Sequence, residues 1–446
     1  MFKRNVIDEL QKWKDSPSRK PLLMRGARQV GKTTVVGEFG KSFDNYLYFN
    51  LEREEHVNLF ESHIPLDMLV EQLFWNAHTT RKPGTTLIFI DEIQNSPKTI
   101  ALLRYFYEDR PDLYVIAAGS LLESIVDVQV SFPVGRVQYM PMRPCSFCEF
   151  VNALGEGHLL EAAADPRLVS VVHNQLSALF NRYVIIGGMP QAVQQYAENR
   201  DVMALDDVYE TLLQAYRDDV EKYVRGSRLT GAVRFLIENA WRYAGSTIAM
   251  NGFAGSTYKS REIGEAFALL EKAMLLELVY PATNTEVPAL TETKRRPKLI
   301  WLDTGLVNYA AGVRSEIIVK TDILDVWRGR IAEHIVAQEL LTLNHRISQR
   351  RAFWTRGAGG ESAEVDFIWT IDSRIIPIEV KSGHNSRLRS LHSFIDAAPV
   401  NVAVRIWSGG FSVDDVQTTV NHKPFRLINL PFYMIWNMER IVRQYL

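Results

Sequence analysis

One segment near the start of the chain constrains its fold more than any other. Residues 26–33 read GARQVGKT, which is a complete G-x-x-x-x-G-K-T phosphate-binding loop. Glycines in such a loop let the backbone turn tightly, so that successive N–H groups point inward and form a nest for anions. The flanks agree, because an apolar run at 21–24 reads as a strand and Thr34 starts a helix whose positive end faces the phosphates.

The loop predicts where the phosphates of a nucleoside triphosphate bind. Lys32 is expected to act on the β and γ phosphates, and the hydroxyl of Thr33 is expected to bind Mg²⁺. The alternative is a chance turn rich in glycine, but such a turn would rarely have both a strand and a helix beside it. We therefore expect ATP and Mg²⁺ as cofactors. The predicted binding positions are Gly26, Ala27, Arg28, Gln29, Val30, Gly31, Lys32, Thr33 and Thr34.

A buried strand followed by two acidic residues is expected further along. Residues 86–90 form a continuous apolar run, typical of a central parallel strand covered on both faces, and Asp91 and Glu92 follow it. Acidic residues at this end of a strand lie where open α/β sheets bind ligands. We expect Asp91 to hold Mg²⁺ and Glu92 to polarise an attacking water, which favours hydrolysis. An ordinary pair of strand-end carboxylates is the alternative.

The next apolar run, residues 113–118, is followed by Gly119 and Ser120. A polar side chain at that strand tip can sense the γ-phosphate or orient water, so we predict a catalytic role for Ser120. The alternative is that Ser120 caps a helix over residues 121–125.

Composition limits the classes of protein to which this chain can belong. Its 446 residues allow two to four domains, and its 46% hydrophobic and 23% charged content is ordinary for a globular protein. A net charge of −1 gives no global reason to bind a polyanion, so a nucleic-acid site has to be a local basic patch. The chain has two cysteines, Cys145 and Cys148, and no run of eighteen apolar residues. We therefore expect a cytoplasmic protein that does not contact a membrane.

The middle of the chain is predicted to be helical and then to change its pattern. Residues 156–226 read as helices and form an expected lid. From about residue 231, two amphipathic helices are followed by two strand-like runs, which is the order of a winged helix. Lys259 and Arg261 begin the second helix, where contacts to DNA are usually made. The cluster Lys294-Arg295-Arg296 lies between the two strand-like runs. A winged helix used only for protein packing is the alternative.

Charged residues gather again in the C-terminal third. Two runs, 363–369 and 376–382, read as the strands of a hairpin, and alternation puts Glu379 and Lys381 on one face of the second strand. Asp366 on the first strand can converge with them. Two carboxylates and a lysine in this order resemble the D…E-x-K site of the PD-(D/E)XK nucleases. In that site the carboxylates bind Mg²⁺ and the lysine orients or deprotonates water.

This resemblance implies catalytic roles for Asp366, Glu379 and Lys381, with Asp366 and Glu379 as metal ligands. Glu333, in a predicted helix over residues 329–340, resembles the helix glutamate that often completes the metal shell. The E-x-K pattern alone is weak, and the other two acids strengthen it. Catalytic activity is a separate question, since many domains of this kind serve only as structural or DNA-holding modules. The alternative for the same residues is a buried polar cluster of Asp366, Glu379 and Lys381 without a metal.

Four segments occur in the order seen in one AAA+-like family, namely RGARQVGKTT, LIFIDEIQNSPK, AAGSLLES and PVGRVQYMPMRPCSFCEF. Over nearly its whole length the chain resembles bacterial and archaeal ATPases that carry a C-terminal domain of unknown function with a restriction-endonuclease-like core. The resemblance implies that Arg136 is an arginine finger or a γ-phosphate sensor, and a structural salt bridge is the alternative. It also implies a homo-oligomer with ATP sites at or near subunit interfaces.

We therefore expect an α/β fold in four parts. These are an AAA+-like P-loop core with a parallel sheet (1–155), a helical lid (156–226), a winged-helix domain (227–312) and a restriction-endonuclease-like α/β domain (313–446). The expected function is ATP hydrolysis coupled to work on DNA, with nuclease activity left open. The rival hypothesis is a nucleotide-dependent switch or scaffold whose nuclease-like domain is inactive and binds protein partners.

Overall fold

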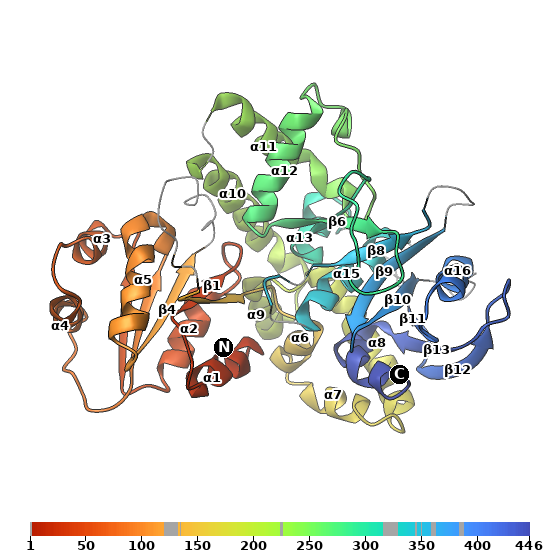
Figure 1. Ribbon diagram of the computed structural model, residues 1–446, viewed down its shortest axis with the longest axis horizontal. Helices are drawn as coiled ribbons and strands as arrows, with labels where there is room; N and C mark the ends of the chain where they lie inside the picture. Colours follow the sequence, from red (N-terminus) through yellow and green to blue (C-terminus); the bar gives the residue numbers. More distant parts are fainter. Residues whose placement is uncertain are drawn as a thin grey trace.

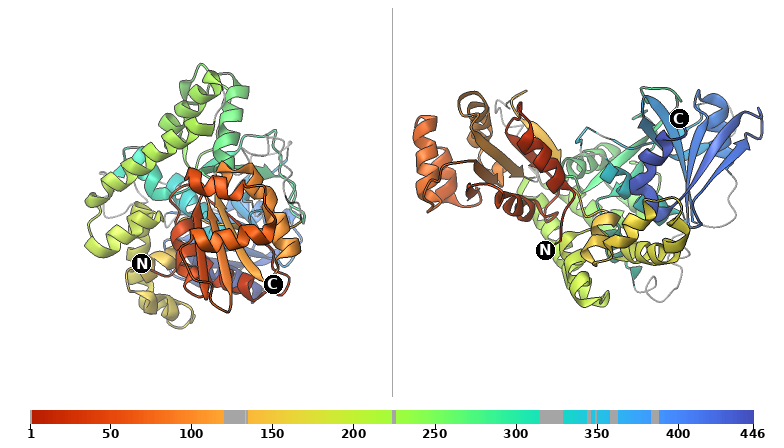
Figure 2. Two further views of the ribbon diagram at one scale, coloured as in Figure 1. Left: turned by 90° about the vertical axis from the view of Figure 1, so that its left-hand side faces the viewer. Right: turned by 90° about the horizontal axis from the view of Figure 1, so that it is seen from below.

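The computed structural model describes residues 2–119, 133, 135–223, 226–314, 329–343, 346–348, 350–357, 363–382 and 388–446. Two sheets organise the described chain, and helices lie between them (Figure 1). The first sheet belongs to the N-terminal part and the second to the C-terminal half. Seen from below, the N-terminal sheet and the C-terminal sheet lie at opposite ends of an elongated molecule (Figure 2).

The N-terminal sheet has five parallel strands in the order β2-β3-β4-β1-β5. Its strands are β1 (Leu22–Arg25), β2 (Asn45–Asn50), β3 (Thr86–Asp91), β4 (Leu113–Gly119) and β5 (Gln138–Pro141). Every residue of β3 is buried, as the sequence analysis expects of a central strand. The parallel order brings the carboxyl ends of β1 and β3 to the same edge, with β4 between them.

Helices cover both faces of this sheet. One apolar cluster includes residues of α4 (Leu66–Asn76) and α5 (Pro97–Asp109), and α3 (Glu54–Phe60) contributes Phe60. The other face packs on α1 (Val6–Asp15) and α2 (Lys32–Gly40), and its apolar cluster continues into the C-terminal half of the chain. The two parts therefore share one continuous core on that side.

A helical middle follows the N-terminal sheet (Figure 1). Its helices are α6 (Phe147–Ala153), α7 (Gly157–Ala163), α8 (Val169–Ile186), α9 (Pro190–Asn199), α10 (Asp206–Tyr223), α11 (Ser227–Asn239) and α12 (Ser260–Lys272). The turn between α8 and α9 is tight, because Gly187 adopts a φ of 71° and Gly188 lies against the backbone of Cys145. Within the described residues, no helix is both long and apolar enough to cross a membrane.

The second sheet is mixed and has eight strands in the order β12-β13-β11-β10-β9-β8-β6-β7. Its strands are β6 (Leu276–Ala282), β7 (Lys298–Trp301), β8 (Ala352–Thr355), β9 (Glu364–Ile371), β10 (Arg374–Lys381), β11 (Val402–Trp407), β12 (Ser412–Gln417) and β13 (Pro424–Pro431). The helices of this part are α13 (Thr304–Ala310), α15 (Arg330–Leu340), α16 (Arg389–Ala397) and α17 (Met438–Arg443), of which α15 and α16 pack on the sheet.

Strands β6 and β7 coincide with the two runs that the sequence analysis assigns to a wing. They pair antiparallel, and β6 continues as the parallel neighbour of β8. The expected hairpin of β9 and β10 is confirmed, with Ile378 opposite Phe367. One sheet therefore contains strands from both sides of residue 312, where the expected winged-helix domain ends and the expected restriction-endonuclease-like domain begins.

Candidate functional site

The phosphate-binding loop has the backbone geometry of an anion nest. Gln29 and Gly31 adopt positive φ angles of 65° and 94°, and α2 begins directly afterwards at Lys32. Gly26 has no room for a side chain, because a Cβ there would lie 2.4 Å from the carbonyl oxygen of Met142. The buried residues Ala27 and Val30 anchor the loop in the core.

The side chain of Lys32 is buried at the base of the loop. Its Nζ donates hydrogen bonds to the carbonyl oxygens of Gly26 and Ala27, both at 2.9 Å. Burial lowers the pKa of Lys32, against the opposing effect of the Glu92 and Asp91 carboxylates. The ammonium is thus held by weak neutral acceptors, which phosphate oxygens can replace with stronger, charge-assisted bonds.

Thr33 and Asp91, the two residues expected to bind Mg²⁺ in the N-terminal core, lie side by side. The hydroxyl of Thr33 donates to Oδ2 of Asp91 over 2.6 Å, and the hydroxyl of Tyr48 lies 3.5 Å from the same oxygen. Burial raises the pKa of Asp91. A hydroxyl and a carboxylate side by side fit Mg²⁺, which is bound in such sites through one or two protein oxygens and the nucleotide phosphates.

Glu92 follows Asp91 with a left-handed backbone (φ 52°) and lines the same cavity as Lys32. The amide of Gln94 donates to its Oε2, which orients the carboxylate. Burial raises the pKa of Glu92 above its ordinary value. A partly buried carboxylate in this position has the orientation and basicity to accept a proton from water.

Lys32, Thr33 and Glu92 line one cavity of about 670 Å³, a volume within the range of small-molecule sites. The loop and α2 supply Arg28, Gln29, Gly31, Lys32, Thr33, Thr34 and Val35. The helical middle contributes Pro190, Gln191, Gln194 and Thr211, which come from α9 and α10. The predicted lid helices therefore form part of the wall.

Two residues that the sequence analysis missed also belong to this region. Asp219 on α10 lies 2.6 Å from Nη1 of Arg28, and Arg4, just before α1, lines the cavity. Asp219 falls in a charged helical stretch that reads as an ordinary solvated face. Only the tertiary fold brings it to the loop.

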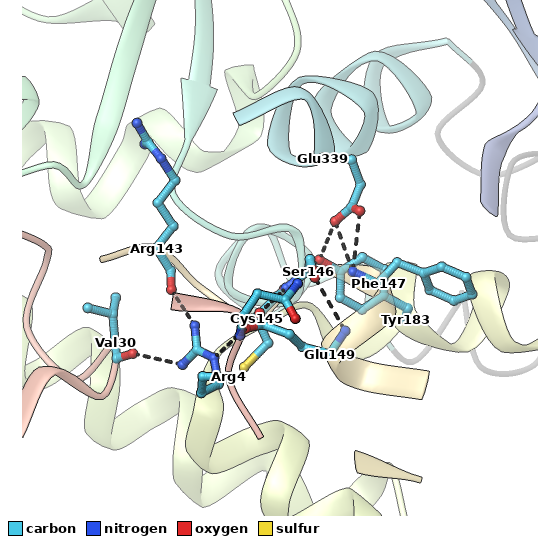
Figure 3. A network of polar contacts seen from close by, with 10 residues as sticks. Arg4, Val30, Arg143, Cys145, Ser146, Phe147, Glu149, Tyr183 and Glu339 are labelled. Carbon is cyan, nitrogen blue, oxygen red and sulfur yellow. Dashed lines mark hydrogen bonds and ion pairs between the residues drawn. The ribbon is translucent and has the colours of Figure 1, made fainter. Parts of the chain in front are cut away.

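A buried polar network connects the loop with the C-terminal part (Figure 3). Arg4 donates to the carbonyl of Val30 at 3.2 Å and to Oε1 of Glu149 at 3.0 Å. Glu149 caps α6, and the N–H of Phe147 at the start of that helix lies 3.2 Å from Oε1 of Glu339 on α15. One chain of contacts thus runs from the loop to α15.

Arg136 does not line the cavity. Arg136 is exposed, and its Nε lies 3.1 Å from Oε1 of Glu108 on α5, in agreement with the alternative of a surface salt bridge. Ser120 lies outside the described residues. Neither of the two predicted catalytic roles is tested by these positions.

The structure brings Glu333, Asp366, Glu379 and Lys381 together at one end of the C-terminal hairpin. Oδ2 of Asp366 accepts a hydrogen bond from the N–H of Val380 at 2.7 Å, and Nζ of Lys381 lies 2.7 Å from Oε1 of Glu379. Burial, followed by the charge of Asp366, raises the pKa of both Glu333 and Glu379 to about 7. The four predicted side chains therefore lie close together, but a fifth charged side chain that was not predicted also contacts this group.

That residue is Lys298, the first residue of β7, which the sequence analysis did not connect with this site. Its Nζ lies 2.8 Å from Oε2 of Glu333, 2.8 Å from Oε1 of Glu364 and 3.8 Å from Oδ1 of Asp366. The side chain is 3% exposed. In the sequence, Lys298 is a lysine at the start of an otherwise apolar strand. Such a lysine is equally typical of an ordinary strand end, so the sequence does not indicate a role in this cluster.

Throughout the described residues, no three His, Cys, Asp or Glu side chains are grouped so that they could hold a metal ion.

Comparison with known proteins agrees with the geometry of the first cavity. Residues 18–151 match the family described as "AAA domain". The N-terminal core thus resembles an AAA-type ATPase domain. Residues 177–317 and 328–423 match two further families, each described as a domain of unknown function (DUF8612 and DUF4143). None of the curated proteins matches the sequence.

The solved structures with some likeness to this chain include the following three. The Walker-type ATPase PABY2304 of Pyrococcus abyssi is 15% identical, over 70% of this chain and 96% of that one, with a TM-score of 0.41. The Aeropyrum pernix ORC1 protein in complex with DNA is 14% identical over 70% and 90%, with a TM-score of 0.30. The Thermotoga maritima RuvB Holliday junction branch migration motor is 14% identical over 66% and 93%, with a TM-score of 0.28.

Proposed function

We propose that this chain binds MgATP, hydrolyses it, and uses the resulting change of state to act on DNA. One observation carries the proposal of hydrolysis: Lys32, Thr33 and Glu92 line a single cavity whose wall includes two helices of the middle region. A site that only stored a nucleotide would need no carboxylate oriented in the cavity.

In this mechanism the loop N–H groups and Lys32 hold the β and γ phosphates. Thr33 and Asp91 would hold Mg²⁺, which would supply positive charge to the phosphate oxygens when bound. Glu92, oriented by Gln94, accepts a proton from the attacking water. Each role uses an atom that already lies at the cavity or is hydrogen-bonded to a residue that lines it.

The second part of the proposal concerns a neighbouring copy of the chain. Arg136 is exposed and pairs with Glu108 at the surface, so we propose that it reaches a γ-phosphate bound by another subunit. In that arrangement the chain is a homo-oligomer with ATP sites at or near its interfaces. Exchange of Glu108 for a phosphate costs little, because exposed ion pairs contribute little to stability.

The proposed DNA contact is the start of α12, supported by α11 and the β6–β7 hairpin. Lys259 precedes this helix, and Arg261 is 88% exposed in its first turn. Acidic residues moderate the patch, because Arg261 pairs with Glu265 over 2.7 Å. We therefore expect weak, salt-sensitive binding that depends on phosphate contacts.

DNA-stimulated ATP hydrolysis tests this proposal. We expect duplex DNA to raise the ATPase rate of the wild type and to bind less tightly as salt rises. The double variant Lys259→Glu/Arg261→Glu is expected to lose both effects but keep its basal rate. Lys41→Glu reverses an exposed charge at the end of α2 and serves as the control. If DNA neither binds at low salt nor changes the rate, the nucleic-acid part of the proposal fails.

A second candidate function has an observation in its favour. The ammonium of Lys298 lies among the acidic residues that a nuclease would use for a metal ion. This arrangement favours a nucleotide-dependent switch or scaffold in which the C-terminal domain does not cleave DNA and instead binds a partner. The two functions share the ATPase cycle and differ in what the C-terminal domain does.

A further inference from the structure

The buried ammonium of Lys298 lies inside the acidic cluster of the C-terminal domain. It is held from two elements at once, by Glu333 on α15 and by Glu364 on β9, each over 2.8 Å. The rings of Phe353 and Phe367 lie 4.9 and 5.8 Å from Nζ and add attraction for a cation. With 3% of its side chain exposed, this lysine is an internal counter-ion rather than a surface group.

We infer that Lys298 is the resident cation of this cluster and takes the place of a divalent metal ion at Glu333 and Asp366. A Mg²⁺ ion needs carboxylate oxygens at about 2.1 Å in near-octahedral geometry, together with several waters. The ammonium lies within 4 Å of both carboxylates. A second cation placed between the same oxygens would meet the charge of Lys298 at close range.

The contacts of the other carboxylate oxygens in the cluster support the same inference. Oδ2 of Asp366 is engaged by the N–H of Val380, so this carboxylate helps to fix the β9–β10 hairpin. Lys381 is directed onto Oε1 of Glu379. Oε2 of Glu379 is buried without a hydrogen-bond partner, and it is the one oxygen of the cluster for which this holds among the described residues. A single carboxylate oxygen does not make a site for Mg²⁺, which binds through at least one further oxygen donor from protein or substrate.

The consequence is a domain with the residues of a metal-dependent nuclease but with an internal ammonium as its cation. The C-terminal domain is then a metal-independent structural or binding module. The cluster belongs to the C-terminal domain, so the role of Lys298 can be tested independently of ATP hydrolysis in the N-terminal core.

Titration of the full-length protein with Mn²⁺ alone, without nucleotide and followed by electron paramagnetic resonance, tests the inference. We expect the wild type and Asp366→Asn to bind Mn²⁺ equally weakly. Lys298→Gln removes the charge at similar size, and we expect it to gain one Mn²⁺ site at least tenfold tighter. That site is expected to disappear in Lys298→Gln/Asp366→Asn.

Two results would overturn the inference. One is a wild-type Mn²⁺ site that Asp366→Asn abolishes, because the metal would then bind despite the ammonium. The other is a folded Lys298→Gln variant that gains no site. If Lys298→Gln does not fold, the comparison of Mn²⁺ binding by the wild type and by Asp366→Asn still tests the inference. Lys298→Arg, which keeps the charge, is then expected to remain as metal-free as the wild type, and an Asp366-dependent Mn²⁺ site in it would count against the inference.

Discussion

Nη1 of Arg28 in the phosphate-binding loop lies 2.6 Å from Oδ1 of Asp219 in α10. This ion pair joins the loop directly to the helix that leads into α11 and α12. The carboxylate of Asp219 also lies close enough to Lys32 to favour its charged form. Its negative charge therefore opposes the arrival of phosphates at the same cations.

The first prediction follows from that charge. Asp219→Asn is expected to tighten ATP binding about three- to tenfold, because the loop then presents one more uncompensated positive charge to the phosphates. The pair is partly exposed, so an effect on the order of 1 kcal/mol is reasonable. Titration with a fluorescent ATP analogue measures the dissociation constant.

Asp218→Asn is the matched control, because Asp218 is the neighbouring residue on the exposed side of α10 and is hydrogen-bonded to Gln214. It is expected to bind ATP as the wild type does. Weaker ATP binding by Asp219→Asn would mean that the ion pair holds α10 in the binding arrangement rather than competing with the phosphates.

The second prediction concerns the tight turn between α8 and α9. A Cβ on Gly188 would lie 2.1 Å from the carbonyl oxygen of Cys145, whose own N–H donates to the carbonyl of Gly188. Gly188→Ala is expected to lower the free energy of unfolding by about 1–3 kcal/mol or more, because backbone has to move. Gly264→Ala in α12 meets no atom within 4 Å and is expected to stabilise by about 0.5–1 kcal/mol. Urea unfolding of both variants distinguishes a local clash from a general cost of adding a methyl group, and equal effects would contradict the packing described.

The third prediction is a pH dependence carried by Glu339, which is buried in the network of Figure 3. The hydroxyl of Tyr183 lies 2.7 Å from Oε1 of Glu339 and 2.8 Å from the carbonyl of Cys145, and it has one proton for two oxygens. A protonated Glu339 supplies the missing hydrogen. In accordance with this, burial raises the pKa of Glu339 to about 7 from 4.5.

Because the folded-state pKa is above the unfolded value, the stabilisation is complete below pH 4.5 and is lost as the pH rises to 7. The loss is on the order of 3 kcal/mol for this group. Glu339→Gln mimics the protonated form, so its Tm relative to the wild type is expected to rise between pH 4.5 and 7. Glu198→Gln, at an exposed position of α9, is expected to follow the wild type. Parallel Tm curves for Glu339→Gln and wild type would exclude a neutral Glu339.

Local patterns predicted much of the N-terminal core. The phosphate-binding loop, the buried strand before Asp91 and the C-terminal hairpin depend on residues close in sequence, where apolar periodicity and glycine spacing carry the information. Asp366 and Glu379 could be brought together from sequence for the same reason, since the hairpin register puts them on adjacent strands.

Long-range contacts could not be predicted in this way. The pairing of β6 with β8 crosses about seventy residues, and it turns an expected separate wing into part of an eight-stranded sheet. Lys298 reaches the acidic cluster only because β7 lies at the edge of that sheet and α15 packs against it. No periodicity in the sequence specifies which lysine meets which carboxylate.

The central claim is that Glu92 makes the cavity a site of hydrolysis rather than of storage. The most direct test measures ATP binding and phosphate release for the wild type and Glu92→Gln in the same buffer with Mg²⁺. We expect equal affinity within a factor of about three, and a turnover at least a hundredfold slower in the variant, as is typical when a catalytic base is removed. Phosphate release at the wild-type rate by Glu92→Gln would contradict the account.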